Sequence, residues 1–270
     1  MSRIAATFAK LRAEQRTALI PFITAGDPTP AVTVPAMHAL VAAGADIVEL
    51  GVPFSDPMAE GPVIQAACER ALAHGVSLRD VLAMVRAFRA TDTTTPVVLM
   101  GYLNPIEAMG YRVFAEALAE AGADGVITVD LPPDEAQDFS QVLSAHGVDP
   151  VYLVAPTSTP ERIRRITEAA RGFVYYVSMK GVTGAAHLDV DSVIAKLAEV
   201  RAYTDLPIGV GFGIQDAAAA AALAAVADAV IVGSVLVNRF AALQQTPDAI
   251  AADIAAFIGD LRAVVDGAPR

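Results

Sequence analysis

Short apolar runs of strand length recur along the chain, and stretches of helical period separate them. The runs are apolar throughout rather than alternating, which is typical of parallel strands buried on both faces. The helical stretches include Tyr111–Ala121, Asp134–His146 and Pro160–Arg171. The predicted strands are Ala18–Thr24, Asp46–Val52, Pro96–Tyr102, Asp124–Asp130, Pro150–Ala155, Phe173–Ser178, Pro207–Phe212 and Asp228–Gly233.

A four-residue sequence introduces several of these strands. Ala-Gly-Ala-Asp occupies 43–46 and again 121–124, and a weaker copy, Ala-Val-Ala-Asp, occupies 225–228. Each copy ends a helical stretch, turns and enters a strand, so one α-to-β unit is used repeatedly. Eight β-then-α units in about 250 residues fit a (β/α)₈ barrel better than an open doubly wound sheet. No Gly-x-Gly-x-x-Gly follows the first strand, and no linker is visible, so we predict a single α/β TIM-barrel domain over residues 1–270.

Additional helices are predicted at both ends of the chain. Met1–Arg16 is amphipathic, which favours a short helix that caps the barrel over a targeting peptide. Gly233-Ser234 would begin a short extra helix before the last one. Two helices should stop at His74-Gly75 and His146-Gly147, because a histidine in the last turn followed by glycine is a stop signal. That role argues against metal binding by these histidines.

Composition narrows the class of protein. Lys and Arg number 19 against 30 Asp and Glu, which gives a net charge of −11, and 54% of residues are hydrophobic. The apolar content excludes a disordered chain, and the acidic balance argues against nucleic-acid binding. The longest uncharged stretch, Pro28–Ala45, contains further prolines and a histidine, which argues against a membrane span. The single cysteine, Cys68, suits a reducing cytoplasm.

One carboxylate interrupts the apolar pattern of the second strand. Aligning the repeats places Glu49 where the other copies have Ile127 and Ile231, at a position that should face the barrel interior. Burying an ionised carboxyl is costly unless it is paired or protonated, and a raised pKa suits general acid–base work. A structural glutamate paired with a cation is the alternative. Asp56 and Glu60 follow in the next loop, which should lie over the barrel mouth.

Glycines after the last strands indicate a phosphate site. Gly181–Gly184 follows the sixth predicted strand, Gly211–Gly213 ends the seventh, and Gly233-Ser234 ends the eighth. Glycine lets backbone N–H groups approach a phosphate, and the start of the extra helix would favour the anion. Ordinary turn glycines are the alternative for any one pair. The three together predict a small phosphorylated substrate.

Several of these segments together resemble the tryptophan synthase α subunit family. They are Leu50–Pro57, Gly181–Gly184 and Gly211–Gly213, and the resemblance extends from Pro21–Pro28 through Gly233-Ser234. Its most specific part runs from Glu49 to Gly61. The resemblance implies a carbon–carbon lyase of L-tryptophan biosynthesis, which cleaves indole-3-glycerol phosphate by a retro-aldol reaction into indole and glyceraldehyde 3-phosphate.

The resemblance also implies roles for individual positions. Glu49 would be the catalytic acid/base that protonates indole C3 and assists deprotonation of the side-chain hydroxyl. Glu60 would accept a hydrogen bond from the indole N–H, and Tyr175 matches a tyrosine close to the catalytic glutamate. The indole pocket would be walled by Phe22, Met100, Ile127, Val129, Leu153 and Phe212. The phosphate would be held by Gly184, Gly213, Gly233 and Ser234.

The chemistry of the reaction itself asks for two carboxyl groups. Breaking the C–C bond leaves electrons at C3 of indole, which is a poor carbanion, so C3 must be protonated first. One carboxyl must deliver that proton while another balances the charge at nitrogen. Glu49 and Glu60 can be these groups, and no metal is required.

Two positions depart from the family pattern. The family usually has Asp where this chain has Glu60, and the extra methylene moves the carboxylate by about 1.3 Å, whereas active sites are held to about 0.5 Å. Either the loop is seated differently or activity is low. Lys180 stands where the family more often has Ser or Thr, and Schiff-base chemistry on this lysine is an alternative.

The resemblance implies a cytoplasmic α₂β₂ heterotetramer in which a β subunit containing pyridoxal phosphate condenses indole with serine. It implies no cofactor in this chain. The β subunit would dock near Pro53–Asp56, Asn104 and Leu131-Pro132, and the loop Lys180–His187 could act as a lid. Two other functions stay open: a catalytically weak barrel that serves as the allosteric partner of the β subunit, and another phosphosugar lyase or isomerase.

Overall fold

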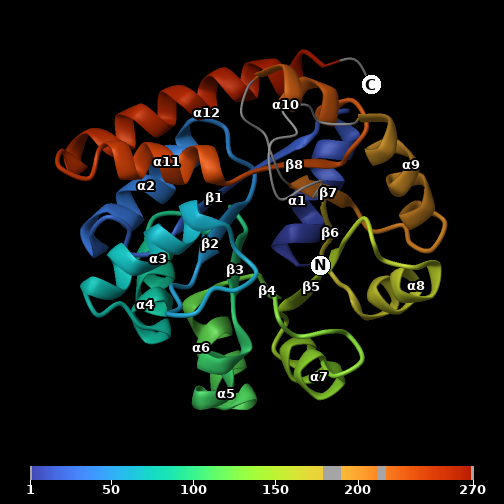
Figure 1. Ribbon diagram of the computed structural model, residues 1–270, viewed down its shortest axis with the longest axis horizontal. Helices are drawn as coiled ribbons and strands as arrows, with labels where there is room; N and C mark the ends of the chain where they lie inside the picture. The colour runs from blue at the N-terminus through green and yellow to red at the C-terminus, as the bar shows by residue number, and fades with distance from the viewer. Residues whose placement is uncertain (1, 179–189, 212–216, 269–270) are drawn as a thin grey trace.

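The apolar runs form a closed parallel barrel. A computed structural model describes residues 2–178, 190–211 and 217–268. The strands are β1 Ala18–Thr24, β2 Val48–Gly51, β3 Val97–Gly101, β4 Gly125–Thr128, β5 Asp149–Val154, β6 Val174–Val177, β7 Ile208–Gly211 and β8 Ala229–Val232. They pair in sequence order, and β8 returns to β1 (Figure 1). The predicted barrel is confirmed.

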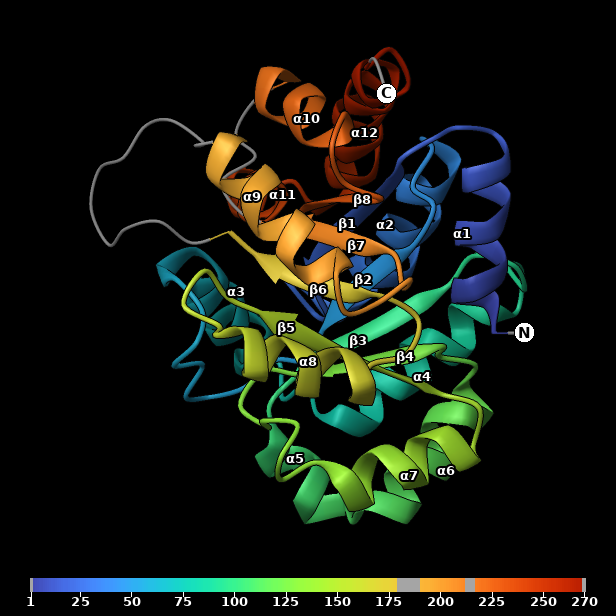
Figure 2. The same cartoon turned by 90° about the vertical axis from the view of Figure 1, so that its right-hand side faces the viewer.

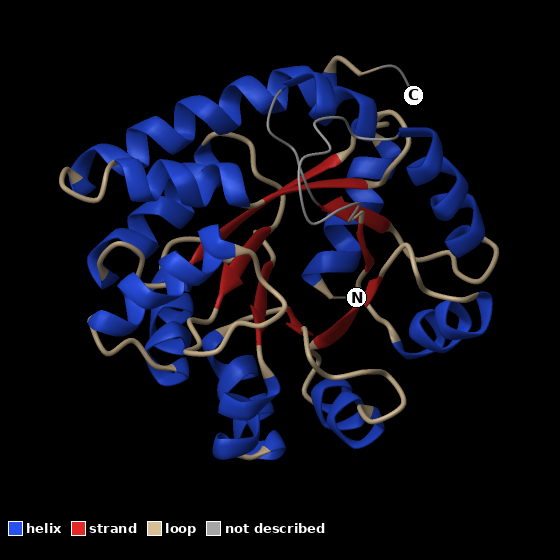
Figure 3. Cartoon of the chain, viewed as in Figure 1, coloured by secondary structure: helices blue, strands red, loops and turns tan. Residues whose placement is uncertain are grey.

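Helices surround the strands on the outside of the barrel (Figure 3). The predicted helix at Tyr111–Ala121 has those bounds, whereas the one predicted from Asp134 begins at Gln137. The difference arises because a turn closed by the Glu135 N–H and the Pro132 carbonyl (3.0 Å) precedes it. The helices are α1 Arg3–Ala13, α2 Pro30–Ala42, α3 Pro62–Ala73, α4 Leu78–Arg89, α5 Leu103–Met109, α6 Tyr111–Ala121, α7 Gln137–Ala145, α8 Pro160–Ala169, α9 Val190–Arg201, α10 Ala217–Ala224, α11 Ser234–Ala242 and α12 Ile250–Asp266.

The N-terminal helix α1 closes the end of the barrel at which the strands begin (Figure 2). Its buried face, Ile4, Phe8 and Leu11, joins the cluster of apolar side chains inside the barrel. The ring of Phe8 lies 5.9 Å from that of Phe173, which directly precedes β6. The prediction of a capping helix is therefore confirmed, and the opposite end of the barrel is left for the loops that follow the strands.

The aspartates of the three sequence repeats have one structural role. Each stands just before a strand, and its carboxylate accepts a hydrogen bond from a backbone N–H near the start of the preceding strand. The pairs are Leu19 with Asp46 (2.9 Å), Val97 with Asp124 (2.8 Å) and Ile208 with Asp228 (2.9 Å). Each aspartate also forms an ion pair with an arginine. The repeat therefore fixes neighbouring strands to each other at their amino ends.

The predicted helix stops are also present. Gly75 and Gly147 adopt positive φ angles of 71° and 74°, which glycine tolerates without strain. His146 Nδ1 lies 2.8 Å from the carbonyl oxygen of Val142 in the last turn of α7. In the described ranges, no helix combines the length and apolar character that a membrane crossing needs.

Candidate active site

Glu49 lies inside the barrel, as its place in the repeat predicted. It is the second residue of β2, opposite Phe22 of β1 and Val98 of β3, and only 1% of its surface is exposed. Among the described residues, its Oε2 atom has no hydrogen-bond partner, and the ion pairs do not include Glu49. The alternative of a glutamate paired for structural reasons therefore has no support in the described part of the chain.

Burial raises the pKa of both candidate carboxyls, but to different values. It raises the pKa of Glu49 to about 8, and the negative charge of Glu60 adds to the effect. The pKa of Glu60 rises to about 7, again because of burial, while the nearby hydroxyl of Tyr102 opposes the rise. Near neutral pH, Glu49 therefore retains a proton that Glu60 gives up more readily, which matches one acid and one charge-balancing group.

The loop between β2 and α3 brings Glu60 to the barrel mouth. The backbone of Glu60 is held by a turn in which its N–H donates to the Pro57 carbonyl (3.0 Å). Gly61 is the N-cap of α3, so Glu60 stands directly before a helix N-terminus, where a negative charge is favoured. The first residue of the loop is bonded to the neighbouring strand β3, because the Val52 N–H donates to the Met100 carbonyl (2.8 Å).

Tyr102 is a polar residue of this site that the sequence analysis did not single out. It follows β3 directly, is 4% exposed, and its hydroxyl accepts a hydrogen bond from the Ala59 N–H (2.9 Å). The ring of Phe54 stacks on it at 4.9 Å. The sequence held one signal for Tyr102, its place at the end of a predicted strand, because active-site groups of such barrels come from the carboxyl ends of strands.

Most of the predicted indole pocket is a set of neighbouring side chains inside the barrel. Met100, Val129, Leu153 and Tyr175 pack against the interior cluster that contains Ile127, and Phe22 lies in an adjoining cluster with Met100. The absence of a side chain at Gly51 gives the Phe22 ring its place, since a Cβ there would lie 2.7 Å from it. Contact of these residues with a substrate stays a prediction.

Tyr175 lies within the electrostatic influence of both carboxyls. Burial raises the pKa of its hydroxyl well above the ordinary value, and the charges of Glu49 and Glu60 raise it further, so the hydroxyl keeps its proton. The ring covers Gly211 of β7 so closely that any Cβ at this position would collide with the hydroxyl. The final glycine of β7 is therefore needed for packing, whatever its role near a phosphate.

The predicted phosphate site falls partly on described residues. Gly233 is the N-cap of α11, Ser234 is its exposed first residue, and the Leu236 N–H bonds the Gly233 carbonyl (2.8 Å). The predicted extra helix is thus present, with its N-terminus at the barrel mouth. The remaining predicted residues lie outside the described ranges: Gly184, Gly213, Phe212, Lys180 and the loop Lys180–His187.

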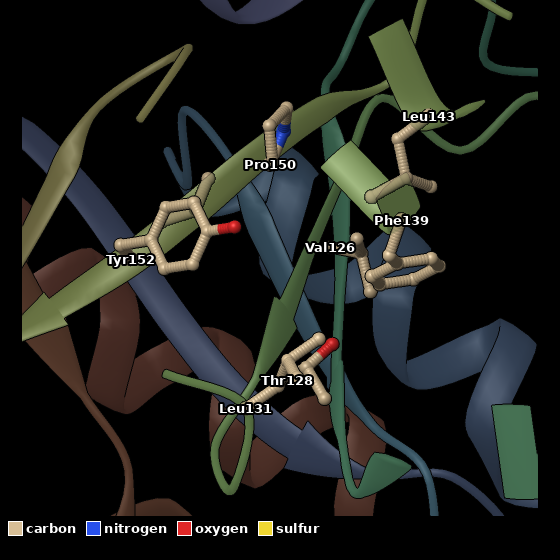
Figure 4. A pocket seen from close by; sticks show the side chains of 8 residues that line it. Val126, Thr128, Leu131, Phe139, Leu143, Pro150 and Tyr152 are labelled. Atoms are coloured by element: carbon tan, nitrogen blue, oxygen red, sulfur yellow. The ribbon is translucent and has the colours of Figure 1, made fainter. Parts of the chain in front are cut away.

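A separate small cavity lies between α7 and the outer face of β4 and β5 (Figure 4). It is lined by apolar side chains together with Thr128 and Tyr152, and has room for about one water molecule. Glu49, Glu60 and Tyr175 are absent from its lining. No group of His, Cys, Asp or Glu among the described residues is arranged to hold a metal ion.

Comparison with known proteins decides the family. The sequence model of the tryptophan synthase alpha chain matches residues 8–266. The chain belongs to the tryptophan synthase alpha chain family. The tryptophan synthase alpha chain of Thioalkalivibrio sulfidiphilus is 65% identical over 266 residues, which cover 98% of this chain and 100% of the relative. That of Alkalilimnicola ehrlichii is 61% identical, over 99% of this chain and 97% of the relative.

Solved alpha chains of tryptophan synthase have the same fold. The crystal structure of the subunit from Legionella pneumophila str. Paris gives a TM-score of 0.92 at 49% identity, covering 98% of this chain and 99% of that one. A chain of Mycobacterium tuberculosis tryptophan synthase gives 0.88 at 44% identity, with 98% of each covered. The predicted tryptophan synthase family, barrel fold and lyase class are confirmed, whereas the roles of single residues stay predictions.

Proposed function

We propose that this chain cleaves indole-3-glycerol phosphate into indole and glyceraldehyde 3-phosphate, with Glu49 as proton donor and Glu60 as the group that balances charge. Membership of the tryptophan synthase alpha chain family supports the reaction. The residue roles rest on one observation: Glu49 is buried with an oxygen that has no partner among the described residues, whereas Glu60 is partly exposed and stands directly before the N-terminus of α3. The first environment favours a neutral carboxyl and the second an ionised one.

The bonds change in two steps. Protonated Glu49 gives its proton to C3 of the indole, which leaves a positive charge on the ring nitrogen, and the carboxylate of Glu60 accepts the N–H. The ionised Glu49 then takes the proton of the side-chain hydroxyl. The oxygen electrons form the aldehyde carbonyl, the C–C bond breaks, and its electrons restore the aromatic indole. Glu49 ends protonated, so the cycle consumes and releases no net proton.

The two pKa values define the pH range in which this cycle can run. Glu60 must be ionised, so activity should rise with pH around 7, and Glu49 must be protonated, so activity should fall above about 8. The expected profile is a bell, and its two limbs describe the coupled pair rather than two independent groups.

We infer that the chain works with a β subunit in an α₂β₂ complex, in which the β subunit carries pyridoxal phosphate. The loop after β2 supports a docking surface there, because Ser55 and Asp56 are exposed and Met58 is 86% exposed. Asn104 is also exposed. Leu131 is buried in the main hydrophobic core, so it can only pack beneath the docking surface. A cytoplasmic location suits the free, buried thiol of Cys68.

The decisive experiment measures indole release from indole-3-glycerol phosphate by the purified chain, with and without a β subunit. The chain has no tryptophan, so indole fluorescence is observed over tyrosine alone. Slow release, acceleration by the β subunit and a loss of about 10²–10⁴-fold in Glu49→Gln would support the proposal. Glu107→Gln, on the exposed face of α5, is the control and should retain full activity. Absence of release even with the β subunit would contradict the proposal and favour another phosphate ester.

A further inference from the structure

Asp27 is a buried carboxylate at the carboxyl end of the barrel that the proposed reaction does not use. It lies in the loop after β1, and its side chain is 1% exposed. Two groups of Arg70, a residue of α3, donate to it: Nε lies 2.6 Å from Asp27 Oδ1, and Nη2 lies 2.9 Å from Oδ2. A two-point contact between planar groups fixes direction as well as distance. The pair therefore ties α3 to the loop after β1 in one orientation.

The helix α3 has few large side chains with which to hold its own position. Its three buried side chains are all small: Ala67, Cys68 and Ala71. The helix α4 is equally long and buries five large apolar side chains, among them Phe88. Large side chains interdigitate with the surface beneath a helix and resist its sliding, whereas small ones do so less. The place of α3 therefore depends more on its ion pair with the loop.

The loop after β1 also holds the other end of the segment that carries Glu60. This segment runs from the end of β2 to the start of α3. At the end of β2, the carbonyl of Gly51 accepts the Ala25 N–H (2.9 Å). Beyond the segment, Asp27 binds Arg70 of α3. One short stretch of chain, residues 25–27, thus contacts the elements on both sides of the Glu60 segment.

This stretch is itself firmly placed. The Gly26 N–H donates to Oγ1 of Thr33 (2.8 Å), a buried residue of α2. Gly26 has a φ angle of 86°, and a Cβ at this position would lie 2.6 Å from Val76 and 3.3 Å from Ala71. The backbone at Gly26 therefore rests directly against the end of α3, and it gives Asp27 a fixed base from which to bind the helix.

We propose that Asp27 and Arg70 are positioning residues for Glu60: their ion pair sets the place of α3, and hence of the carboxylate that stands directly before its first turn. The inference rests on the proposed function of Glu60 and deepens it. A helix is a rigid element, so a displacement at one end is transmitted to the other. Active-site groups are held to about 0.5 Å, so a small tilt of α3 should matter at Glu60.

Two variants test the pair in steps, each assayed in the αβ complex. Asp27→Asn keeps the shape of the side chain and removes its charge, whereas Arg70→Lys keeps the charge and loses the two-point contact. Per folded molecule, kcat should fall about 10-fold in Asp27→Asn and about 3-fold in Arg70→Lys. The KM for indole-3-glycerol phosphate should change little, because Glu60 acts mainly on charge that develops during the reaction.

A matched control exists at the opposite end of the barrel. There Asp46, also in a loop, binds Arg262 of α12 at 2.9 Å, and the two side chains are 14% and 9% exposed. Asp46→Asn breaks this pair and should leave kcat per folded molecule unchanged. A loss in Asp46→Asn equal to that in Asp27→Asn would show that any broken ion pair of this burial lowers activity, and would overturn the proposal.

A double variant tests whether the pair acts through Glu60. Once Glu60 is replaced in Glu60→Gln, the further change Arg70→Lys should cause little additional loss of kcat. A loss repeated in full in the Glu60→Gln background would show that the pair supports the fold without positioning Glu60, and would overturn the inference.

Amide hydrogen exchange separates this inference from the proposed function, because it needs no turnover. In Asp27→Asn, residues 52–66 should exchange about 10-fold faster, while α4 should match wild type. Asp46→Asn should leave residues 52–66 at the wild-type rate. Unchanged exchange of residues 52–66 in Asp27→Asn would overturn the positioning role even if the lyase reaction stands. Faster exchange there supports that role, and full lyase activity in Glu60→Gln would then contradict only the proposed role of Glu60 in the reaction.

Discussion

Asp124 and Glu49 are buried carboxylates at the two ends of the barrel, and they are held in opposite ways. At the amino end, Asp124 is 4% exposed and bonded to Arg3 (2.8 Å), to Arg89 (2.7 Å) and to the Val97 N–H. At the carboxyl end, Glu49 is 1% exposed, and its Oε2 accepts no hydrogen bond from the part of the chain that the structure describes. The partners of a carboxylate, rather than its burial, therefore distinguish a group that stabilises the fold from one that is available for chemistry.

The largest expected loss of stability is at the amino end. Asp124→Asn removes the closer of the two ionic partners of Arg89, whose guanidinium is 10% exposed and lies 2.7 Å from Asp124 but 3.9 Å from Asp92, and should cost about 3 kcal/mol of unfolding free energy. Asp228→Asn removes the corresponding aspartate of another repeat, whose arginine is 43% exposed, and should cost about 1 kcal/mol or less. Urea unfolding checks both. Equal losses would show that burial of the pair does not matter, and lyase activity per folded molecule should be unchanged in each.

At the carboxyl end, the stability of the fold should depend on pH through Glu49. Because the pKa of Glu49 is about 8 in the folded chain and near 4.5 otherwise, the folded state keeps a proton that the unfolded chain loses. The contribution of Glu49 to stability is complete below pH 4.5 and is lost as pH rises toward 8. The stability of Glu49→Gln relative to wild type should therefore increase by roughly 4 kcal/mol between pH 5 and pH 8.5.

Unfolding curves at the two pH values test this, with Glu107→Gln as the control that should follow wild type. A constant difference between Glu49→Gln and wild type at both pH values would mean that Glu49 titrates normally and is not the proton donor.

A smaller effect should follow from crowding Tyr175. Gly211→Ala places a methyl group against the Tyr175 hydroxyl and ring, and should cost about 1–3 kcal/mol of stability together with part of the lyase activity. Gly259→Ala in α12 is the matched control: no atom lies within 4 Å of its added methyl, so stability should hold or rise. Thermal unfolding and initial rates compare the two. Tolerance of Gly211→Ala would place Tyr175 elsewhere than over this glycine.

The smallest expected effect concerns the length of the second carboxylate. Glu60→Asp shortens the side chain by one methylene and draws the carboxylate about 1.3 Å away from the position that the proposed function gives it, so kcat should fall about 5-fold, equivalent to about 1 kcal/mol. Steady-state cleavage with the β subunit present measures it. A sharp rise in turnover would instead favour the hypothesis of a catalytically weak barrel that serves as an allosteric partner.

The fold could be predicted largely from local patterns. The run at Ala18–Thr24 has the bounds of β1, and the repeated Asp at 46, 124 and 228 marks equivalent junctions. The start of α7 was predicted at Asp134 rather than Gln137. The turn between Pro132 and Glu135 precedes the helix, and propensity alone does not decide whether such a turn belongs to it.

The candidate site was predictable where one residue violated a pattern. Glu49 was visible because a carboxylate in an apolar strand is costly wherever the strand is buried. Tyr102 was not visible, since nothing near it in the chain indicates that its hydroxyl accepts the N–H of Ala59, which belongs to a loop some 40 residues earlier. Likewise, the need for glycine at 211 depends on Tyr175 of the neighbouring strand.

Hydrophobic periodicity and contiguous motifs were enough to predict the order of strands and helices, the capping helix, the interior carboxylate and the family. The partners of the buried carboxylates depend on the fold: among the described residues, Oε2 of Glu49 has no hydrogen-bond partner, whereas Asp124 has two arginines, and the pKa of Glu49 lies above that of Glu60. The physical reason is that desolvation and hydrogen bonding depend on which side chains the closed barrel brings together, and parallel neighbours in a barrel are far apart in the chain.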